Sequence, residues 1–156
     1  MSLNPTHDPA ARSWLAAANE AACDFPIQNL PFGVFRRTGS SEAARGGVAI
    51  GDAIVDLAAL ARDAVFTGPA ARGAEACAQA TLNDFMASGP EVWSALRHAL
   101  FGLLHQGAEG AGLQAVRACL VPQAAVEMLL PARIGDYTDF YTSIHHALNV
   151  GRVVRP

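Results

Sequence analysis

The sequence predicts an α+β fold, and two observations carry that prediction. Two short β-branched runs, residues 48–50 and 53–57, flank a Gly51-Asp52 pair, which is a signal for a tight hairpin. Farther along, apolar residues recur at three- and four-residue steps after Pro90, as on one face of an amphipathic helix: Val92, Trp93, Leu96, Leu100, Leu103 and Leu104. Strands followed by helices in one short chain are typical of an α+β domain.

A helix and a strand are expected before the hairpin. Residues 9–22 are rich in alanine, with Trp14 and Leu15 toward one side, so they predict a helix. Closely spaced prolines then interrupt the pattern and lead into an expected strand over residues 34–36. The small and polar residues 37–47 are typical of a hairpin loop.

Helical segments dominate the chain after the hairpin. A short helix is expected to begin near Asp56. Thr81 and Asp84 have the spacing of a capping box, which predicts the start of another helix. Residues 128–131 are apolar, are expected to be extended, and lead the chain into its last stretch.

Composition restricts the class of protein. The 156 residues are 51% hydrophobic and 16% charged, which suits one domain, or one domain with the start of another. A net charge of -3 without a basic stripe argues against nucleic acid as a partner. The chain has no lysine, so no ammonium group can serve as a nucleophile.

The cysteines and the N-terminus bear on the compartment. Three widely spaced cysteines form no CxxC pair, which argues against zinc and for free thiols in a reducing compartment. The N-terminus lacks the pattern of a secretory signal, and no apolar stretch is long enough to span a bilayer. We therefore expect a cytoplasmic protein with no membrane partner.

The last stretch, residues 134–156, gathers the groups that can bind a metal or move a proton. Because the sequence stops at Pro156, directly after this cluster, we expect the chain to carry only part of a site. The cluster comprises Asp136, Tyr137, Asp139, Tyr141, His145, His146, Arg152 and Arg155.

The spacing of the acids and histidines leaves alternatives open. In a helical turn Asp136 and Asp139 would share a face, yet a hard divalent cation wants about six oxygen ligands, so a single carboxylate is a poor chelator. Either aspartate could instead cap a helix that starts around residues 140–146. The adjacent His145 and His146 point about 100° apart on a helix, so they suit one ion poorly.

The glycine and arginines that follow are equally open to two interpretations. Gly151 is expected to end the helix, which would place Arg152 and Arg155 beyond its end. One of these guanidinium groups could hold a substrate carboxylate through a two-pronged contact. Each could equally be a surface arginine.

The segment IGDYTDFYTSIHHALNVG closely resembles the segment that opens the catalytic domain of the fumarylacetoacetases. Upstream, DFPIQNLPFGVF, GVAIGDAIVDL, FTGP and TLNDFMASGPEVW resemble successive stretches of the N-terminal domain of that family. The resemblance covers about residues 24–156, and several separated motifs in one order are more specific than any one of them.

The resemblance implies a fold and a division of the chain. It implies a small SH3-like β-barrel with helices, followed by the first segment of a mixed β-roll catalytic domain. Residues 1–23 would be an N-terminal extension, expected to be helical. Residues 24–130 would form the N-terminal domain, and residues 131–156 the start of the catalytic domain.

The resemblance also implies residue roles. Asp139 would be a ligand of Ca²⁺ or Mg²⁺, Tyr141 and Arg155 would contact a β-diketo acid substrate, and His146 would be the general base that activates water. Asp136 and His145 receive no role, and the family usually has glutamine where His145 stands. The glutamate that orients the histidine and the remaining metal ligands of the family would lie beyond Pro156.

The activity implied is hydrolysis of a carbon–carbon bond in a ketonic substrate, fumarylacetoacetate, to fumarate and acetoacetate. This reaction belongs to tyrosine and phenylalanine catabolism, and the family implies a homodimer. The chain alone is expected to be inactive. Two alternatives remain: another hydrolase of the superfamily, of the acylpyruvate type, or a module that mediates association without catalysis.

Overall fold

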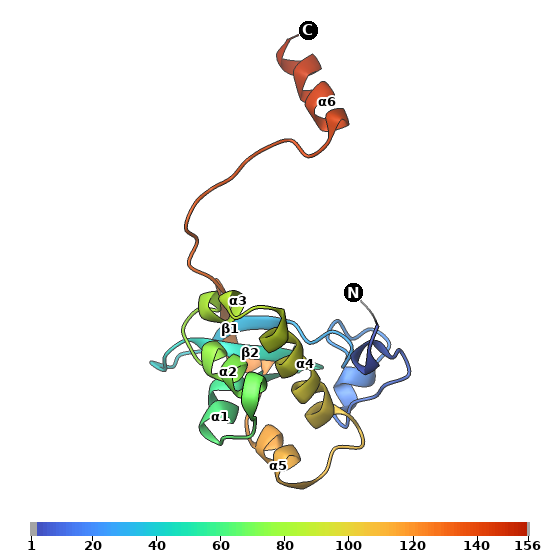
Figure 1. The fold of residues 1–156 in the computed structure, drawn as a ribbon, viewed down its shortest axis with the longest axis vertical. Coiled ribbons are helices and arrows are strands. Elements are labelled where there is room, and N and C mark those ends of the chain that lie inside the picture. The colour runs from blue at the N-terminus through green and yellow to red at the C-terminus, as the bar shows by residue number, and fades with distance from the viewer. Residues whose placement is uncertain (1–2, 156) are drawn as a thin grey trace.

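A computed structural model describes residues 3–155; residues 1, 2 and 156, at the outer ends of the expected first and last segments, lie outside it. The fold is α+β, as predicted, and Figure 1 shows its elements. The strands are β1 (Phe32–Arg37), β2 (Arg45–Ile50), β3 (Ala53–Asp56), β4 (Leu120–Pro122) and β5 (Val126–Leu129). The α-helices are α1 (Leu57–Arg62), α2 (Gly68–Cys77), α3 (Asn83–Ala87), α4 (Pro90–Leu104), α5 (Gly110–Ala118) and α6 (Ile144–Val154), and the 3₁₀ helices are η1 (Pro5–His7), η2 (Ala16–Asn19) and η3 (Gln123–Ala125).

The five strands form one antiparallel sheet in the order β4-β3-β2-β1-β5. The predicted hairpin is its centre: β2 and β3 pair from Gly47 opposite Asp56 to Ile50 opposite Ala53. Gly51 in the turn has a φ of 57°, a left-handed conformation that glycine adopts without strain. The hairpin prediction is therefore confirmed.

The sheet curls strongly without closing. Its edge strands β4 and β5 are joined by η3 alone, so Pro122 and Val126 lie four residues apart. Four residues span at most about 14 Å, whereas a flat five-stranded sheet would hold its outer strands about 19 Å apart. Within the described residues β4 and β5 do not pair, so the expected β-barrel is present only as an open, curved sheet.

The two faces of the sheet contribute to two clusters. On the inside of the curl, Phe35 of β1 packs with Ile54 and Val121, although β2 and β3 separate β1 from β4. On the outside, Val34 and Val55 join the main core, which α1, α2 and α4 complete (Figure 1). Neighbouring residues on one strand thus serve opposite faces, as the period of two in a β-strand requires.

Helix α4 is the predicted amphipathic helix. Its buried residues, Val92, Leu96, Leu100 and Leu104, recur every four positions and face the core. Pro90 stands in its first turn, as predicted, because the missing N–H of proline costs nothing there. Helix α2 packs closely against it, since a Cβ on Gly73 would meet Val92 and Leu96 at 3.1–3.3 Å.

The helix predicted over residues 9–22 is wrong. The structure has a 3₁₀ turn, η2, and an isolated bridge between Ser13 and His105. The hydroxyl of Ser13 donates to the carbonyl of Leu104 at 2.7 Å, and the indole N–H of Trp14 donates to that of Leu103 at 2.9 Å. These bonds satisfy free carbonyls at the end of α4, and they hold Ser13 and Trp14 out of a helix in spite of the alanines around them.

A buried ion pair joins the hairpin to α1. The Asp56 carboxylate, 4% exposed, accepts from Arg45 Nε at 2.7 Å and caps α1 by accepting from the N–H of Ala59 at 3.1 Å. The Arg45 guanidinium also lies over the Phe35 ring, 4.8 Å from its centre. Burial alone would lower the pKa of Arg45, but hydrogen bonds and charge from Asp56 and Glu42 raise it.

Candidate functional site

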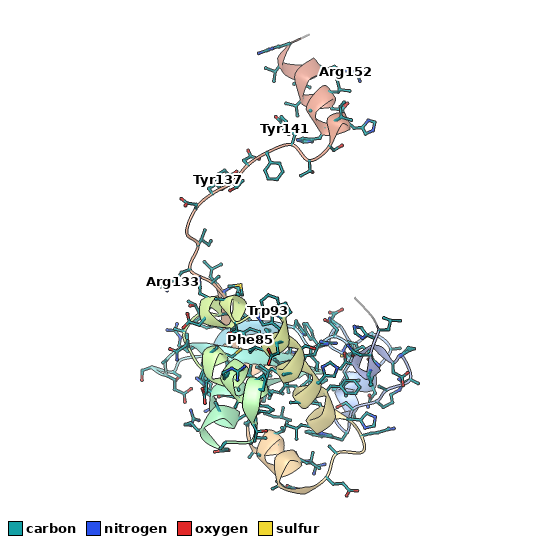
Figure 2. The ribbon with its side chains drawn as sticks, in the orientation of Figure 1. Phe85, Trp93, Arg133, Tyr137, Tyr141 and Arg152 are labelled. Carbon is teal, nitrogen blue, oxygen red and sulfur yellow. The ribbon has the colours of Figure 1, made fainter. Side chains whose placement is uncertain are left out.

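The predicted site residues lie on a segment that leaves the rest of the protein. We call residues 134–155 the arm and residues 3–133 the body. Residues 134–143 form neither helix nor strand, and α6 follows them at a distance from the body (Figure 1). Figure 2 shows Arg133 where the arm begins beside α3, and Tyr137 and Tyr141 farther along it.

Two of the predicted residues meet on the arm. Tyr141 lies just before α6, and His146 is in the first turn of that helix. Their ring centres are 4.9 Å apart with an angle of 59° between the planes. The structure therefore brings the predicted general base against a predicted substrate contact.

Along the chain, Asp139 precedes this pair and Arg155 follows it. Asp136 and Asp139 both lie in the non-helical part of the arm, so they share no helical face. Arg155 is the C-cap of α6, and its N–H donates to the carbonyl of Gly151 at 2.8 Å. Arg155 lies nine positions after His146, which is about 14 Å along the helix axis.

Helix α6 begins within the range expected for its start, at Ile144, but it does not end where expected. It begins after Ser143, whose side chain makes no capping hydrogen bond, so neither aspartate serves as the cap. It runs through Gly151 to Val154, so the predicted end at Gly151 is wrong and Arg152 lies within the helix. A glycine inside a helix costs about 1 kcal/mol, which by itself does not end the helix.

The arm also exposes many apolar side chains. Exposed apolar side chains follow one another along it, from Ile134, 78% exposed, to Val154, 70% exposed. Large exposed apolar surfaces mark places where another protein surface packs. Six such residues accompany these two: Tyr137, Phe140, Tyr141, Ile144, Leu148 and Val153.

The donor set on the arm suits a hard cation in kind but not in number. Asp139 offers carboxylate oxygens, the ligands that Ca²⁺ and Mg²⁺ prefer. Among residues 3–155, no three His, Cys, Asp or Glu side chains gather where they could hold an ion. The residues present therefore fit one ligand position of a metal site and do not form the site.

Two hollows in the body lie away from the predicted residues. One, of about 300 Å³, opens inside the curl of the sheet and is lined by apolar residues that include Phe25, Phe35 and Met128. The other, of about 710 Å³, runs along α3 and α4 beside Trp93.

No helix in the described part of the chain is long and apolar enough to cross a membrane.

One residue of α3 that holds the chain just before the arm, Asn83, escaped the sequence reasoning. The capping box predicted from Thr81 and Asp84 is wrong, since α3 begins at Asn83 with Leu82 as its N-cap and no side-chain capping bond. The Asn83 side chain instead bonds the backbone of Arg133, fifty residues away. No local sequence pattern predicts a contact between residues so far apart.

Comparison with known proteins identifies the family. The sequence profile described as "Fumarylacetoacetase N-terminal" matches residues 28–131. The fumarylacetoacetase of Oryza sativa subsp. japonica is 47% identical over 137 residues, which cover 84% of this chain and 32% of that protein. Those of Bos taurus and Homo sapiens are each 44% identical over 135 residues, which cover 85% of this chain and 32% of those proteins.

The matched part of each relative fixes the extent of the similarity. The chain spans about a third of the length of the curated relatives that it matches. Identities of 44–47% over most of this chain are far above the level at which only a fold is shared. On this similarity, the chain belongs to the fumarylacetoacetase family.

Proposed function

We propose that this chain is the N-terminal portion of a fumarylacetoacetase, which hydrolyses fumarylacetoacetate to fumarate and acetoacetate in tyrosine and phenylalanine catabolism. The observation that carries the proposal is the 47% identity over 137 residues to a protein of that name. The compact body would serve as the N-terminal domain. The arm would contribute the first catalytic groups to the domain that follows.

Hydrolysis of the β-diketone would require specific roles of residues on the arm. His146 takes a proton from water, and the resulting hydroxide adds to a ketone carbon of the β-diketone. The carbon–carbon bond then breaks, and the carbon that leaves with the electron pair takes up a proton. The Tyr141 ring packs against the imidazole of His146 and restricts its orientation.

The remaining assignments concern charge. Arg155 suits a substrate carboxylate, because a guanidinium can donate two parallel hydrogen bonds. Asp139 would be one ligand of Ca²⁺ or Mg²⁺, with the others supplied outside this chain. When bound, such an ion acts as a Lewis acid on a carbonyl oxygen.

The setting of the protein is part of the same proposal. The strong curl of the sheet supports assignment of the body to an SH3-like domain, and residues 131–156 would open a mixed β-roll catalytic domain. We place the protein in the cytoplasm, because its three cysteines are free, as in a reducing compartment. The exposed apolar arm suits a protein that works as a homodimer with its catalytic domain packed on this segment.

Neighbouring residues on the arm provide matched controls for the test. In the protein extended through its catalytic domain, His146→Ala is expected to abolish hydrolysis of fumarylacetoacetate while cation affinity is retained. His145→Ala should leave turnover near the unmodified level. Equal turnover of all three proteins would refute the assignment of the base.

The acids are tested in the same way. Asp139→Ala should weaken Ca²⁺ or Mg²⁺ binding measured by calorimetry, whereas Asp136→Ala should not. Identical affinities would refute the role of Asp139. Cleavage of acylpyruvates but not of fumarylacetoacetate would instead assign the protein to the acylpyruvate-type hydrolases, and the absence of any hydrolysis would favour an association module.

A further inference from the structure

Three hydrogen bonds join residues 131–133, which lead into the arm, to Leu82 and Asn83 at the start of α3. The N–H of Leu82 donates to the carbonyl of Pro131 at 2.7 Å. Two residues farther along, the N–H of Arg133 donates to Asn83 Oδ1 at 2.8 Å, and Asn83 Nδ2 donates to the carbonyl of Arg133 at 3.2 Å. The side-chain amide of Asn83 thus pairs with both backbone groups of Arg133, as the peptide group of a neighbouring strand would.

The element that presents Asn83 is itself held in place. The indole N–H of Trp93 on α4 donates to the carbonyl of Phe85 at 2.6 Å. The ring of Phe85 lies 4.8 Å from that of Phe32, which belongs to β1. Because α3 is bonded to a core helix and packed on a core strand, it is a rigid support for the Asn83 amide.

The same stretch is fixed immediately upstream. Strand β5 pairs with β1 as far as Leu129, opposite Val34. Beyond Arg133, residues 134–143 belong to no helix or strand, and the structure records no hydrogen bond from them back to the body. The pairing at Asn83 is therefore the last attachment before the arm leaves.

We propose that Asn83 is a positioning residue, whose side-chain amide clamps the backbone at Arg133 and sets the direction in which the arm leaves the body. Asp139 follows six residues later, within about 20 Å of chain. The consequence for catalysis rests on the proposed function: the groups at Asp139, Tyr141 and His146 would take their starting position from this clamp. Misplacement of a catalytic group by about 1 Å can lower the rate about a hundredfold, so a small shift of the chain at Arg133 should reduce turnover.

The clamp itself can be tested in this chain with trypsin. The chain has no lysine, so trypsin cuts only after arginine. The carbonyl of Arg133 is the group that trypsin must attack, and it is also the acceptor of the Asn83 amide. Cleavage therefore requires the clamp to open, and its rate reports the population of the open form.

The rate of cleavage after Arg133 is expected to differ among the variants. Asn83→Ala should speed cleavage after Arg133 about tenfold, the effect of two lost hydrogen bonds. Asn83→Asp keeps the acceptor for the Arg133 N–H and loses the donor, so it should give an intermediate rate. Cleavage after Arg152, within α6, is the internal reference and should not change. Asn29→Ala is the control variant, because it removes a side-chain bond to the backbone elsewhere on the surface.

Two results would overturn the clamp. One is an unchanged rate after Arg133 in both Asn83 variants. The other is an equal acceleration after Arg133 and Arg152, which would indicate general loosening. If the alanine variant unfolds, the Asn83→Asp variant decides, since it retains one of the two bonds. Urea unfolding of each variant establishes that the fold is intact.

Turnover separates the clamp from the proposed function. In the protein extended through its catalytic domain, Asn83→Ala should lower kcat for fumarylacetoacetate and leave KM near its unmodified value, with Asn83→Asp in between. An unchanged kcat would overturn the positioning role. If the unmodified extended protein does not hydrolyse fumarylacetoacetate, the proposed function fails, and the trypsin result alone decides whether the clamp is correct.

Discussion

Replacement of Gly46 by alanine would place a methyl carbon 2.4 Å from the carbonyl oxygen of Cys77. Gly46 is a buried residue of β2, and Cys77 is the last residue of α2, so the substitution drives a strand and a helix apart. The obstructing atom belongs to the backbone and cannot rotate away. The side chain of Cys77 is fully buried, and any movement therefore opens the main core.

The expected cost follows from two opposing terms. Overpacking of a core costs about 1–3 kcal/mol of the free energy of unfolding. Alanine also lowers the conformational entropy of the unfolded chain relative to glycine, which raises the free energy of unfolding by about 0.4–1 kcal/mol. The net effect of Gly46→Ala is therefore a destabilisation of about 1–2 kcal/mol, or a fall of about 3–6 °C in Tm for a domain of this size.

Gly102 provides the matched control. It lies within α4, and no atom stands within 4 Å of a Cβ built on it. The same substitution should stabilise the protein there by about 0.5–1 kcal/mol, because alanine favours the helix. Urea unfolding followed by the fluorescence of Trp14 and Trp93 measures both variants. Gly46→Ala at or above the unmodified stability would refute the close packing of β2 against α2.

Three further predictions concern the ion pair, the thiols and the metal. Asp56→Ala should destabilise by about 3 kcal/mol, because it leaves the largely buried Arg45 with only the more exposed Glu42 as a partner and removes the cap of α1. Asp56→Asn keeps a capping oxygen and should cost less, and urea unfolding measures both. Iodoacetamide at pH 8 should spare Cys77 and Cys119 until the protein unfolds, because burial raises the pKa of these thiols to about 12 and about 11; mass spectrometry reads the labels. Calorimetry should show that this chain alone binds Ca²⁺ no more tightly than about millimolar.

Each of these has a contrary outcome. Equal stability of the two Asp56 variants would show that the capping oxygen contributes nothing and that the whole cost comes from the lost charge. Early labelling of Cys77 would contradict its place in the core. Submicromolar Ca²⁺ affinity would contradict the conclusion that the arm holds only one ligand position.

Local sequence was sufficient wherever an element is decided by adjacent residues. The hairpin around Gly51 and the helix that begins at Pro90 are examples, since the turn conformation, the missing N–H and the apolar period all act within a few residues. The N-cap at Asp56 belongs to the same group, because its acceptor serves an N–H three residues away.

Failures occurred where distant residues decide the conformation. The conformation around Ser13 and Trp14 is set by hydrogen bonds to the end of α4, which lies some ninety residues farther along the chain. These bonds override the helical preference of the neighbouring alanines. Strand β4 is only three residues long and exists through its pairing with β3, so no local pattern in the sequence marks it. On the arm, the contact of Tyr141 with His146 is local, but nothing around Asn83 indicates that its partner lies at Arg133.

The position of β5 at the sheet edge has a consequence for the order in which the protein forms. Arg36 on β1 and Glu127 on β5 form an ion pair across 91 residues of sequence. At 5–20 residues per second, a ribosome needs roughly 5–18 s to make that stretch. During this interval the outer edge of β1 exposes unpaired backbone groups, which other chains can recognise. The nascent chain therefore stays open to misassociation until the residues just before the arm have emerged.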